Sequence, residues 1–215
     1  THIHDDHVAG IEDLRPFSLF GDVDIYAQND VVEGLHHTMP YCFKEHLYPG
    51  VPHLRLHTVE AHKAIHVCRE KSIMAQFPAS GSSLEGVVNR QPTVVKVKPA
   101  TDALDIIPIR VMHGQLPILG YRIGPFAYIT DMKTIDEAEI PYLQGVETLV
   151  VNALRFEKTH HSHQLVDDAI AFSRRIGAKR TYFTHLTHDI GTHHIANTRL
   201  PEGFSFAYDG EVIEV

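Results

Sequence analysis

The first seven residues, Thr1-His2-Ile3-His4-Asp5-Asp6-His7, constrain the chain more than any other stretch. Three histidines and two aspartates fall within six consecutive positions, and no apolar alternation remains to indicate an ordinary strand. On an extended backbone His2 and His4 point to the same side, and Asp6 and His7 follow where a turn can bring them to a second point. Imidazole nitrogens and carboxylate oxygens together suit a borderline divalent ion such as Zn²⁺ or Mn²⁺. The stretch therefore predicts a metal-binding loop that needs further ligands from elsewhere in the chain.

This H-x-H-x-D-H spacing resembles the metal-binding signature of the metallo-β-lactamase superfamily. In that family the signature lies on a loop between a buried strand and a helix, and it contributes to a two-metal site. Any one of these histidines alone would more often be a surface residue, so the resemblance rests on the complete spacing.

Length and composition allow one hydrophobic core and exclude several classes of protein. With 215 residues, 43% hydrophobic and 21% charged, the chain predicts a single domain over residues 1–215. No run approaches the roughly 18 apolar residues of a membrane span, and no secretory leader is visible. The two cysteines, Cys42 and Cys68, provide no disulfide framework, which favours a cytoplasmic location. A net charge of −8 argues against nucleic-acid binding.

Apolar periodicity predicts mixed α/β structure. The first third predicts a helix broken near Pro16, a strand, and a helix capped by Asn29, over residues 8–20, 22–27 and 29–39. Residues 41–103 are the least legible, with possible strands at 54–59 and 94–98 and a loop at 80–83. His62 and His66 have the i,i+4 spacing of a helical metal pair, although no carboxylate stands beside them.

The pattern is clearer from Leu104 onward. Four apolar runs predict strands over residues 104–112, 118–123, 126–130 and 147–152, and another strand is expected at 181–184. Apolar residues at helical spacing predict a helix ending at Gly177, with a stripe made of Leu165, Ala169, Phe172 and Ile176. Residues 204–208 and 212–215 predict a closing hairpin across Asp209-Gly210. Strands followed by a helix and another strand favour α/β layers.

Three metal-competent residues follow predicted strands. His113, Asp131 and His185 each stand at the carboxyl end of an apolar run. Side chains at such positions are held by a rigid sheet edge, as a preorganised site requires. Each alone would more often be a loop residue, but together they supply the further ligands that the opening motif needs.

Longer motifs resemble one branch of the superfamily, which holds the phosphoribosyl 1,2-cyclic phosphate phosphodiesterase. The stretches are Val111-Met112-His113-Gly114, Tyr128-Ile129-Thr130-Asp131, His160-His161-Ser162-His163, Phe183-Thr184-His185-Leu186-Thr187-His188, and the tail from Leu200 to Gly210. The resemblance implies an αββα sandwich of two mixed β-sheets flanked by helices. Relatives carry strands and a C-x-C-x₂-C zinc loop before the opening motif, so the chain is expected to be N-terminally incomplete.

The resemblance also implies a role for each site residue. One metal would be held by His2, His4 and His113, a second by Asp6, His7 and His185, and Asp131 would bridge the two. His163 would act on the scissile phosphate, with Asp6 as a further catalytic group and His160 beside the substrate. Asn152 stands where many relatives carry an aspartate that is not a metal ligand. His188 matches the fourth ligand of a structural zinc, whose three cysteines Cys42 and Cys68 cannot replace.

The function implied is hydrolysis of a small cyclic or linear phosphodiester by in-line attack of a hydroxide shared between two divalent ions, Zn²⁺ or Mn²⁺. Alternatives are a tRNA 3′-processing nuclease, a thioester hydrolase of the same fold, and a catalytically silent metal-binding protein. The acidic net charge disfavours the nuclease, which needs a basic RNA-binding surface. Expected partners are the small substrate and a second copy of the chain in a homodimer, with neither nucleic acid nor membrane.

Overall fold

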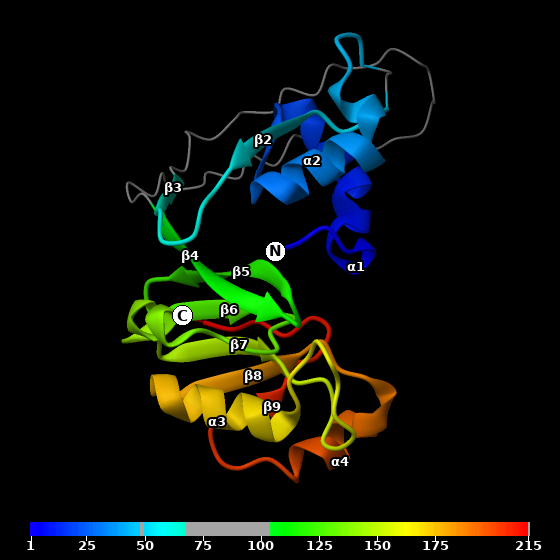
Figure 1. The fold of residues 1–215 in the computed structure, drawn as a ribbon. Coiled ribbons are helices and arrows are strands. Elements are labelled where there is room, and N and C mark those ends of the chain that lie inside the picture. Colours follow the sequence, from blue (N-terminus) through cyan, green and yellow to red (C-terminus); the bar gives the residue numbers. More distant parts are fainter. Residues whose placement is uncertain (48–49, 68–103, 215) are drawn as a thin grey trace, which may run out of the picture.

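The computed structural model describes residues 1–47, 50–67 and 104–214 of the chain (Figure 1). The expected strand at 94–98, the loop at 80–83 and Cys68 lie outside these ranges. Within them, the strands expected from residue 104 to residue 184 are confirmed with small changes at their ends.

A seven-stranded mixed sheet forms the larger part of the structure, in the order β3-β4-β5-β6-β7-β8-β9. The strands from β3 to β6 pair antiparallel, and those from β6 to β9 pair parallel. Their bounds are Ile65–Val67, Leu104–His113, Leu116–Ile123, Phe126–Ile129, Thr148–Asn152, Arg180–Thr184 and Phe204–Phe206. All five residues of β7 are buried, as its unbroken apolar sequence predicts for a central parallel strand.

Helix α3 (Val166–Ile176) crosses one face of this sheet (Figure 1) and completes the main core. Its Ala169, Phe172 and Ile176 are buried, whereas Leu165 is the residue before the helix. Gly177 ends the helix in a left-handed conformation with φ of 76°, as expected for a C-terminal glycine cap.

A smaller unit near the N-terminus contains two parallel strands, β1 (Val23–Ala27) and β2 (Leu54–Thr58), and helix α2 (Asn29–Thr38). Its own apolar cluster consists of Ala27, Val31, Leu35, Met39 and Cys42. The two sheets with flanking helices confirm the predicted α/β fold class. The smaller sheet, however, is parallel rather than mixed in the described part of the chain.

The remaining helices are short. They are α1 (Asp5–Val8), α4 (His193–Asn197) and the 3₁₀ helices η1 (Ala9–Phe20), η2 (Pro40–Phe43), η3 (Glu137–Leu143) and η4 (His188–Ile190). None of the described helices has both the length and the apolar character that crossing a bilayer requires.

Three local predictions are wrong. The helix expected at 8–20 with a break near Pro16 instead begins at Asp5 as one α-helical turn and continues as a 3₁₀ helix from Ala9 to Phe20, with Pro16 inside it. Asn29 is the first helical residue rather than the cap, and its amide donates to Glu33. The closing hairpin is absent from the described residues, since Phe204–Phe206 pairs parallel with β8 and Val212 is 86% exposed.

The spacing of His62 and His66 does not place them on a helix. His62 lies in a turn with φ of 68°, and its Nε2 is 2.6 Å from Oε2 of the buried Glu139. His66 lies on β3 and pairs with Asp105. These two histidines therefore serve separate contacts, and the i,i+4 interpretation is incorrect.

A buried hydroxyl pair joins α3 to the sheet and allows a test of core packing. Ser173 Oγ and Thr181 Oγ1 lie 2.6 Å apart, with 0% and 1% of their residues exposed. We expect Ser173→Ala to lower the free energy of unfolding by about 1–3 kcal/mol, because the Thr181 hydroxyl loses its partner. The double variant Ser173→Ala/Thr181→Val should be more stable than this single variant in urea unfolding. A double variant less stable than Ser173→Ala would contradict the claim that the unpaired Thr181 hydroxyl causes the loss of stability.

Candidate metal centre

The opening motif lies between the smaller unit and the large sheet (Figure 1), where the Thr1 carbonyl accepts from the Leu119 amide at 3.5 Å. His2 is 2% exposed, and its Nε2 lies 2.9 Å from Nδ1 of His4. The helical turn α1 begins immediately after His4, so Asp6 and His7 point from a turn rather than from the extended segment. The sequence thus presents its first four ligand candidates in two pairs.

Three strands deliver the other candidates to the same edge of the large sheet. His113 is the last residue of β4, and Asp131 and His185 follow β6 and β8. Because β4, β6 and β8 run in the same direction, their carboxyl ends meet at one edge. Asp131 and His185 both adopt left-handed backbone, with φ of 58° and 55°. Such conformations cost non-glycine residues about 1–3 kcal/mol and are concentrated at functional sites.

The structure brings all seven candidates together in two adjoining groups. Within each group the possible ligand atoms lie within 4.8 Å of one another, and the groups are His2, His4 and His113, and Asp6, His7, Asp131 and His185. Asp131 links the two sets, because a further group of the same compactness joins it to His113 and His163. The residues that the family resemblance assigns to each metal thus lie close together, and their binding of metal stays a prediction.

The donor chemistry of this cluster fits divalent metal ions. His113 Nδ1 donates to the carbonyls of Asp131 and Ser162 at 2.8 and 3.1 Å, which leaves Nε2 free to act as a ligand. Thr130 Oγ1 donates to Asp131 Oδ2 at 2.7 Å. His7 Nε2 is buried and makes no hydrogen bond, although Asp131 Oδ2 lies 2.9 Å away. An electron-rich nitrogen facing a carboxylate oxygen in this way suits a shared cation.

His163 lies beside the two groups. It is 8% exposed, and its Nδ1, which is buried without a hydrogen-bond partner, lies 3.5 Å from Asp131 Oδ1. Its ring centroid is 4.9 Å from that of His160, and the ring of exposed His161 follows at 4.4 Å from His160. Lys133, which the sequence did not single out, donates from Nζ to the His163 carbonyl at 3.0 Å. The one sequence feature that could have indicated this contact is the position of Lys133, two residues after Asp131.

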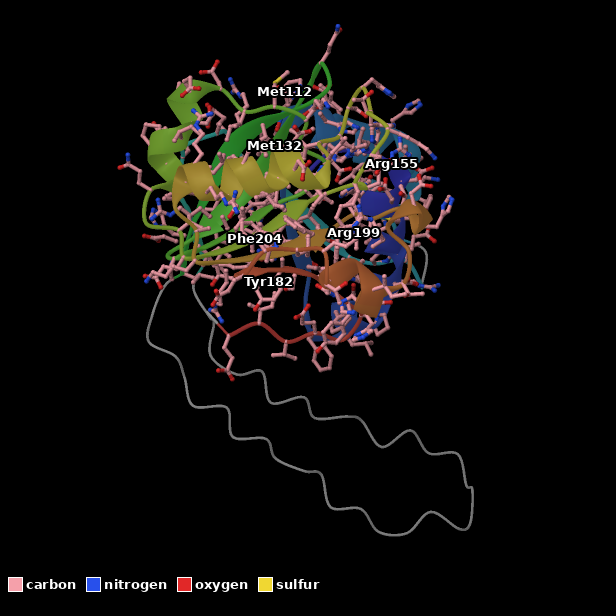
Figure 2. All side chains as sticks on the ribbon, turned by 90° about the horizontal axis from the view of Figure 1, so that it is seen from below. Met112, Met132, Arg155, Tyr182, Arg199 and Phe204 are labelled. Atoms are coloured by element: carbon pink, nitrogen blue, oxygen red, sulfur yellow. The ribbon has the colours of Figure 1, made fainter. Side chains whose placement is uncertain are left out.

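Arg155 and Arg199, both labelled in Figure 2, contact the first residues of the loop that carries these histidines. Arg155 donates to the Lys158 carbonyl at 2.9 Å and to Asp189 at 3.2 Å. Arg199, from the segment after α4, lies over the Phe156 ring with its guanidinium carbon 3.5 Å from the centroid. These contacts restrain residues 155–158, at the start of the loop that leads to His163.

Burial and neighbouring charges shift the pKa values of several groups. Burial, followed by repulsion from nearby imidazoles, lowers the pKa of His2 and of His163 to about 4. The hydrogen bond that His185 donates to Asp131 raises the pKa of His185. Hydrogen bonds from His185 and Thr130 hold the pKa of Asp131 well below its usual range despite the opposing effect of burial. The Asp131 carboxylate therefore stays ionised, while the buried imidazoles of His2 and His163 are neutral near pH 7.

Asn152 holds the backbone next to Asp131. Its Oδ1 accepts from the Met132 amide at 2.8 Å, and its Nδ2 donates to the Met132 carbonyl at 3.0 Å. Gln164, the neighbour of His163, donates from Nε2 to the Asn152 carbonyl at 2.8 Å. An asparagine supplies both a donor and an acceptor here, which an ionised aspartate cannot do. Asn152 therefore connects the Asp131 turn to the His163 loop.

His188 belongs to none of the candidate metal groups among the described residues, and its side chain is 97% exposed. Its nearest charged neighbour is Asp189, with 3.8 Å between His188 Nε2 and Oδ1. A zinc-binding role for His188 stays a prediction.

Comparison with known proteins is consistent with this geometry. A family model described as the beta-lactamase superfamily domain matches residues 1–186. The chain belongs to the beta-lactamase superfamily. An octanoyltransferase of Porphyromonas gingivalis (strain ATCC BAA-308 / W83) is 33% identical over 210 residues. That match covers 98% of this chain but 36% of the relative, so the chain spans about a third of the curated relative's length.

Several solved structures have a similar fold. The crystal structure of a new diphosphatase from the PhnP family aligns with a TM-score of 0.72 and 30% identity, covering 98% of this chain and 67% of that one. Human tRNase Z, short form, aligns with a TM-score of 0.60 and 18% identity over 100% of this chain and 76% of its own. Zn²⁺-bound PqqB from Methylobacterium extorquens aligns with a TM-score of 0.64 and 15% identity, covering 100% of this chain and 71% of that one. The last two similarities establish the fold alone.

The lowered histidine pKa values predict how the metal-free protein responds to acid. Unfolding returns the pKa values of His2 and His163 from about 4 towards 6.5. Between pH 4 and pH 6.5 the unfolded chain therefore binds more protons than the folded protein. We therefore expect the stability of EDTA-treated protein to fall as the pH drops from about 6.5 to about 4. His185 opposes this trend, because its raised pKa contributes stability below 6.5 that is lost as the pH rises. Urea unfolding at several pH values measures the result, and greater stability at pH 4 would contradict it.

Asn152 gives a second test. Asn152→Leu should lower the free energy of unfolding by about 1–3 kcal/mol, because it leaves the buried Met132 amide without a partner. It should also weaken metal binding, since the Asp131 turn loses its support. Asn197→Leu is the matched control, because Asn197 also accepts a backbone amide, that of Phe206 at 2.9 Å, but belongs to none of the metal groups. Equal loss of metal in both variants would refute the specific role of Asn152.

Proposed function

We propose that this chain is a two-metal phosphodiesterase that acts on a small cyclic or linear phosphodiester. The observation that carries the proposal is the pair of adjoining ligand groups with the buried His163 beside their shared carboxylate. The 30% identity to a PhnP-family diphosphatase supports a phosphate substrate rather than another of the chemistries known for this fold.

We assign His2, His4 and His113 to one metal and Asp6, His7 and His185 to the other, with Asp131 between them. Two bound divalent ions would activate water near neutral pH and offset the charge on phosphate oxygens. The protein contributes by holding the ligands in place. Asp131 stays ionised because His185 and Thr130 donate hydrogen bonds to it, and His113 is oriented by two carbonyls.

We assign proton transfer to His163. With its pKa lowered to about 4 the imidazole is neutral in the protein alone. An anionic phosphate placed against the ring favours its protonated form, which can then give a proton to the leaving alkoxide. We also assign a phosphate contact to His160, and the 4.9 Å between its ring and that of His163 supports this. No serine or cysteine nucleophile is needed for this reaction.

Three alternatives belong to the same test. A tRNA 3′-processing nuclease is disfavoured by the net charge of −8. A thioester hydrolase would share the metals, and the name of the P. gingivalis relative makes an octanoyl thioester a suitable competing substrate. Purified metal-loaded protein should hydrolyse bis-p-nitrophenyl phosphate and a ribose cyclic phosphate but not a structured tRNA precursor or octanoyl thioester. Metal binding without turnover of any substrate would identify a silent binding protein.

His163→Ala should lower kcat by about 10²–10⁴ while the metal content stays that of the unchanged protein, as for loss of a general acid. His161→Ala is the matched control, because His161 lies in the same loop but is exposed. Steady-state kinetics together with metal analysis of both variants measure the effect. Because His163 also forms a compact group with His113 and Asp131, loss of one metal equivalent in His163→Ala would show that it is a ligand instead.

A further inference from the structure

We propose that Gly34 is a positioning residue for the His2–His4 pair, an inference that rests on the metal-dependent function proposed above. Gly34 lies inside α2, which contributes no ligand candidate of its own. A Cβ atom at this position would lie 2.6 Å from Cγ1 of Ile3 and 2.9 Å from its Cδ1. Ile3 stands directly between the two histidines. The opening motif therefore rests on the bare backbone of the helix.

The reason for a glycine at position 34 is the lack of room for a side chain beside Ile3, and not a need for an unusual backbone conformation. The backbone φ angle of Gly34 is not positive, so an alanine could adopt the same backbone conformation. Glycine inside a helix costs about 1 kcal/mol relative to alanine. The helix thus carries a less favourable residue where the Ile3 side chain lies against its backbone. Gly10 differs in this respect, because a Cβ there would meet nothing within 4 Å.

Ile3 has little freedom to move aside. Its side chain is branched at Cβ and therefore stiff about χ1. It also packs against the apolar cluster of the smaller unit, which includes Val31 and Leu35 on either side of Gly34 in α2. Relief of the overlap then requires a shift of the Ile3 backbone, and this backbone carries His2 and His4. A shift of the Ile3 backbone would therefore also move the imidazole nitrogens of His2 and His4.

Alanine at this position should have opposite effects on the helix and on the metal centre. We expect Gly34→Ala to weaken the binding of the metal held by His2, His4 and His113 by about tenfold, within the range seen when groups that orient metal ligands are lost. The unfolding temperature of the EDTA-treated protein should change little, because the gain of about 1 kcal/mol from alanine in a helix offsets much of the cost of the overlap with Ile3. Competition with a chromophoric chelator measures affinity, and the visible spectrum of Co²⁺-loaded protein reports the ligand geometry. Gly10→Ala should leave both readings unchanged.

A double-variant cycle with Ile3 separates this contact from a general effect. The Cβ of Ile3 lies 3.5 Å from the position of the added methyl, an ordinary contact distance. In an Ile3→Ala background, Gly34→Ala should therefore change the metal affinity by less than about twofold. In an Ile3→Val background the loss should persist, because valine keeps the branched γ carbons. Comparison within each background removes the effect of trimming Ile3 itself.

The results distinguish this inference from the function on which it rests. If the unchanged protein binds metal and Gly34→Ala binds it equally well, the positioning role is wrong and the proposed function is unaffected. If Gly34→Ala loses metal affinity equally in the Ile3→Ala background, the contact with Ile3 is not the cause and the inference fails. Absence of metal binding in the unchanged protein would overturn the proposed function together with this role.

Discussion

Asp131 is a carboxylate with 2% of its surface exposed, and its oxygens lie 2.9 Å from His7 Nε2 and 3.0 Å from His185 Nε2. Removing such a charge from water is costly unless cations or hydrogen-bond donors compensate it. Thr130 and His185 provide part of that compensation. The pKa values of His2 and His163 are lowered by burial, so these two neighbours are neutral imidazoles near pH 7 and do not supply the rest of the compensation. The strand ends, the motif and the histidine loop are all arranged around this one group.

The centre lies between two apolar clusters. The main core fixes β4, β6 and β8 and hence the residues at their carboxyl ends. The smaller cluster holds α2 and, through Ile3, the opening motif. Side chains from two independent cores can form one metal centre only if both packings are accurate, because a shift of about 1 Å at a preorganised site is enough to impair it. Asn152 and Gly34 act at these two supports, one on each side.

Much of this arrangement follows from sequence periodicity. Continuous apolar runs marked the central strands because both faces of those strands are buried, and Gly177 marked the end of α3 because only a left-handed residue closes it well. Prediction was poorer where spacing alone was ambiguous. The i,i+4 pair His62 and His66 lies on a turn and a strand, and the residues after Asp209 carry no strand within the described range. In both cases tertiary partners, Glu139 for His62 and β8 for Phe204–Phe206, decided the structure.

The sequence by itself determined the metal-competent residues, because an H-x-H-x-D-H spacing and polar residues at strand ends are local features of the chain. It also determined the fold class, since the order of strands and helices limits how layers can pack. Only the tertiary structure decided which residues support the ligands. The contacts between Asn152 and Met132, Lys133 and His163, and Ile3 and Gly34 span 20, 30 and 31 positions. Neither hydrophobic periodicity nor short motifs record contacts at such separations, because these depend on how distant segments fold against each other.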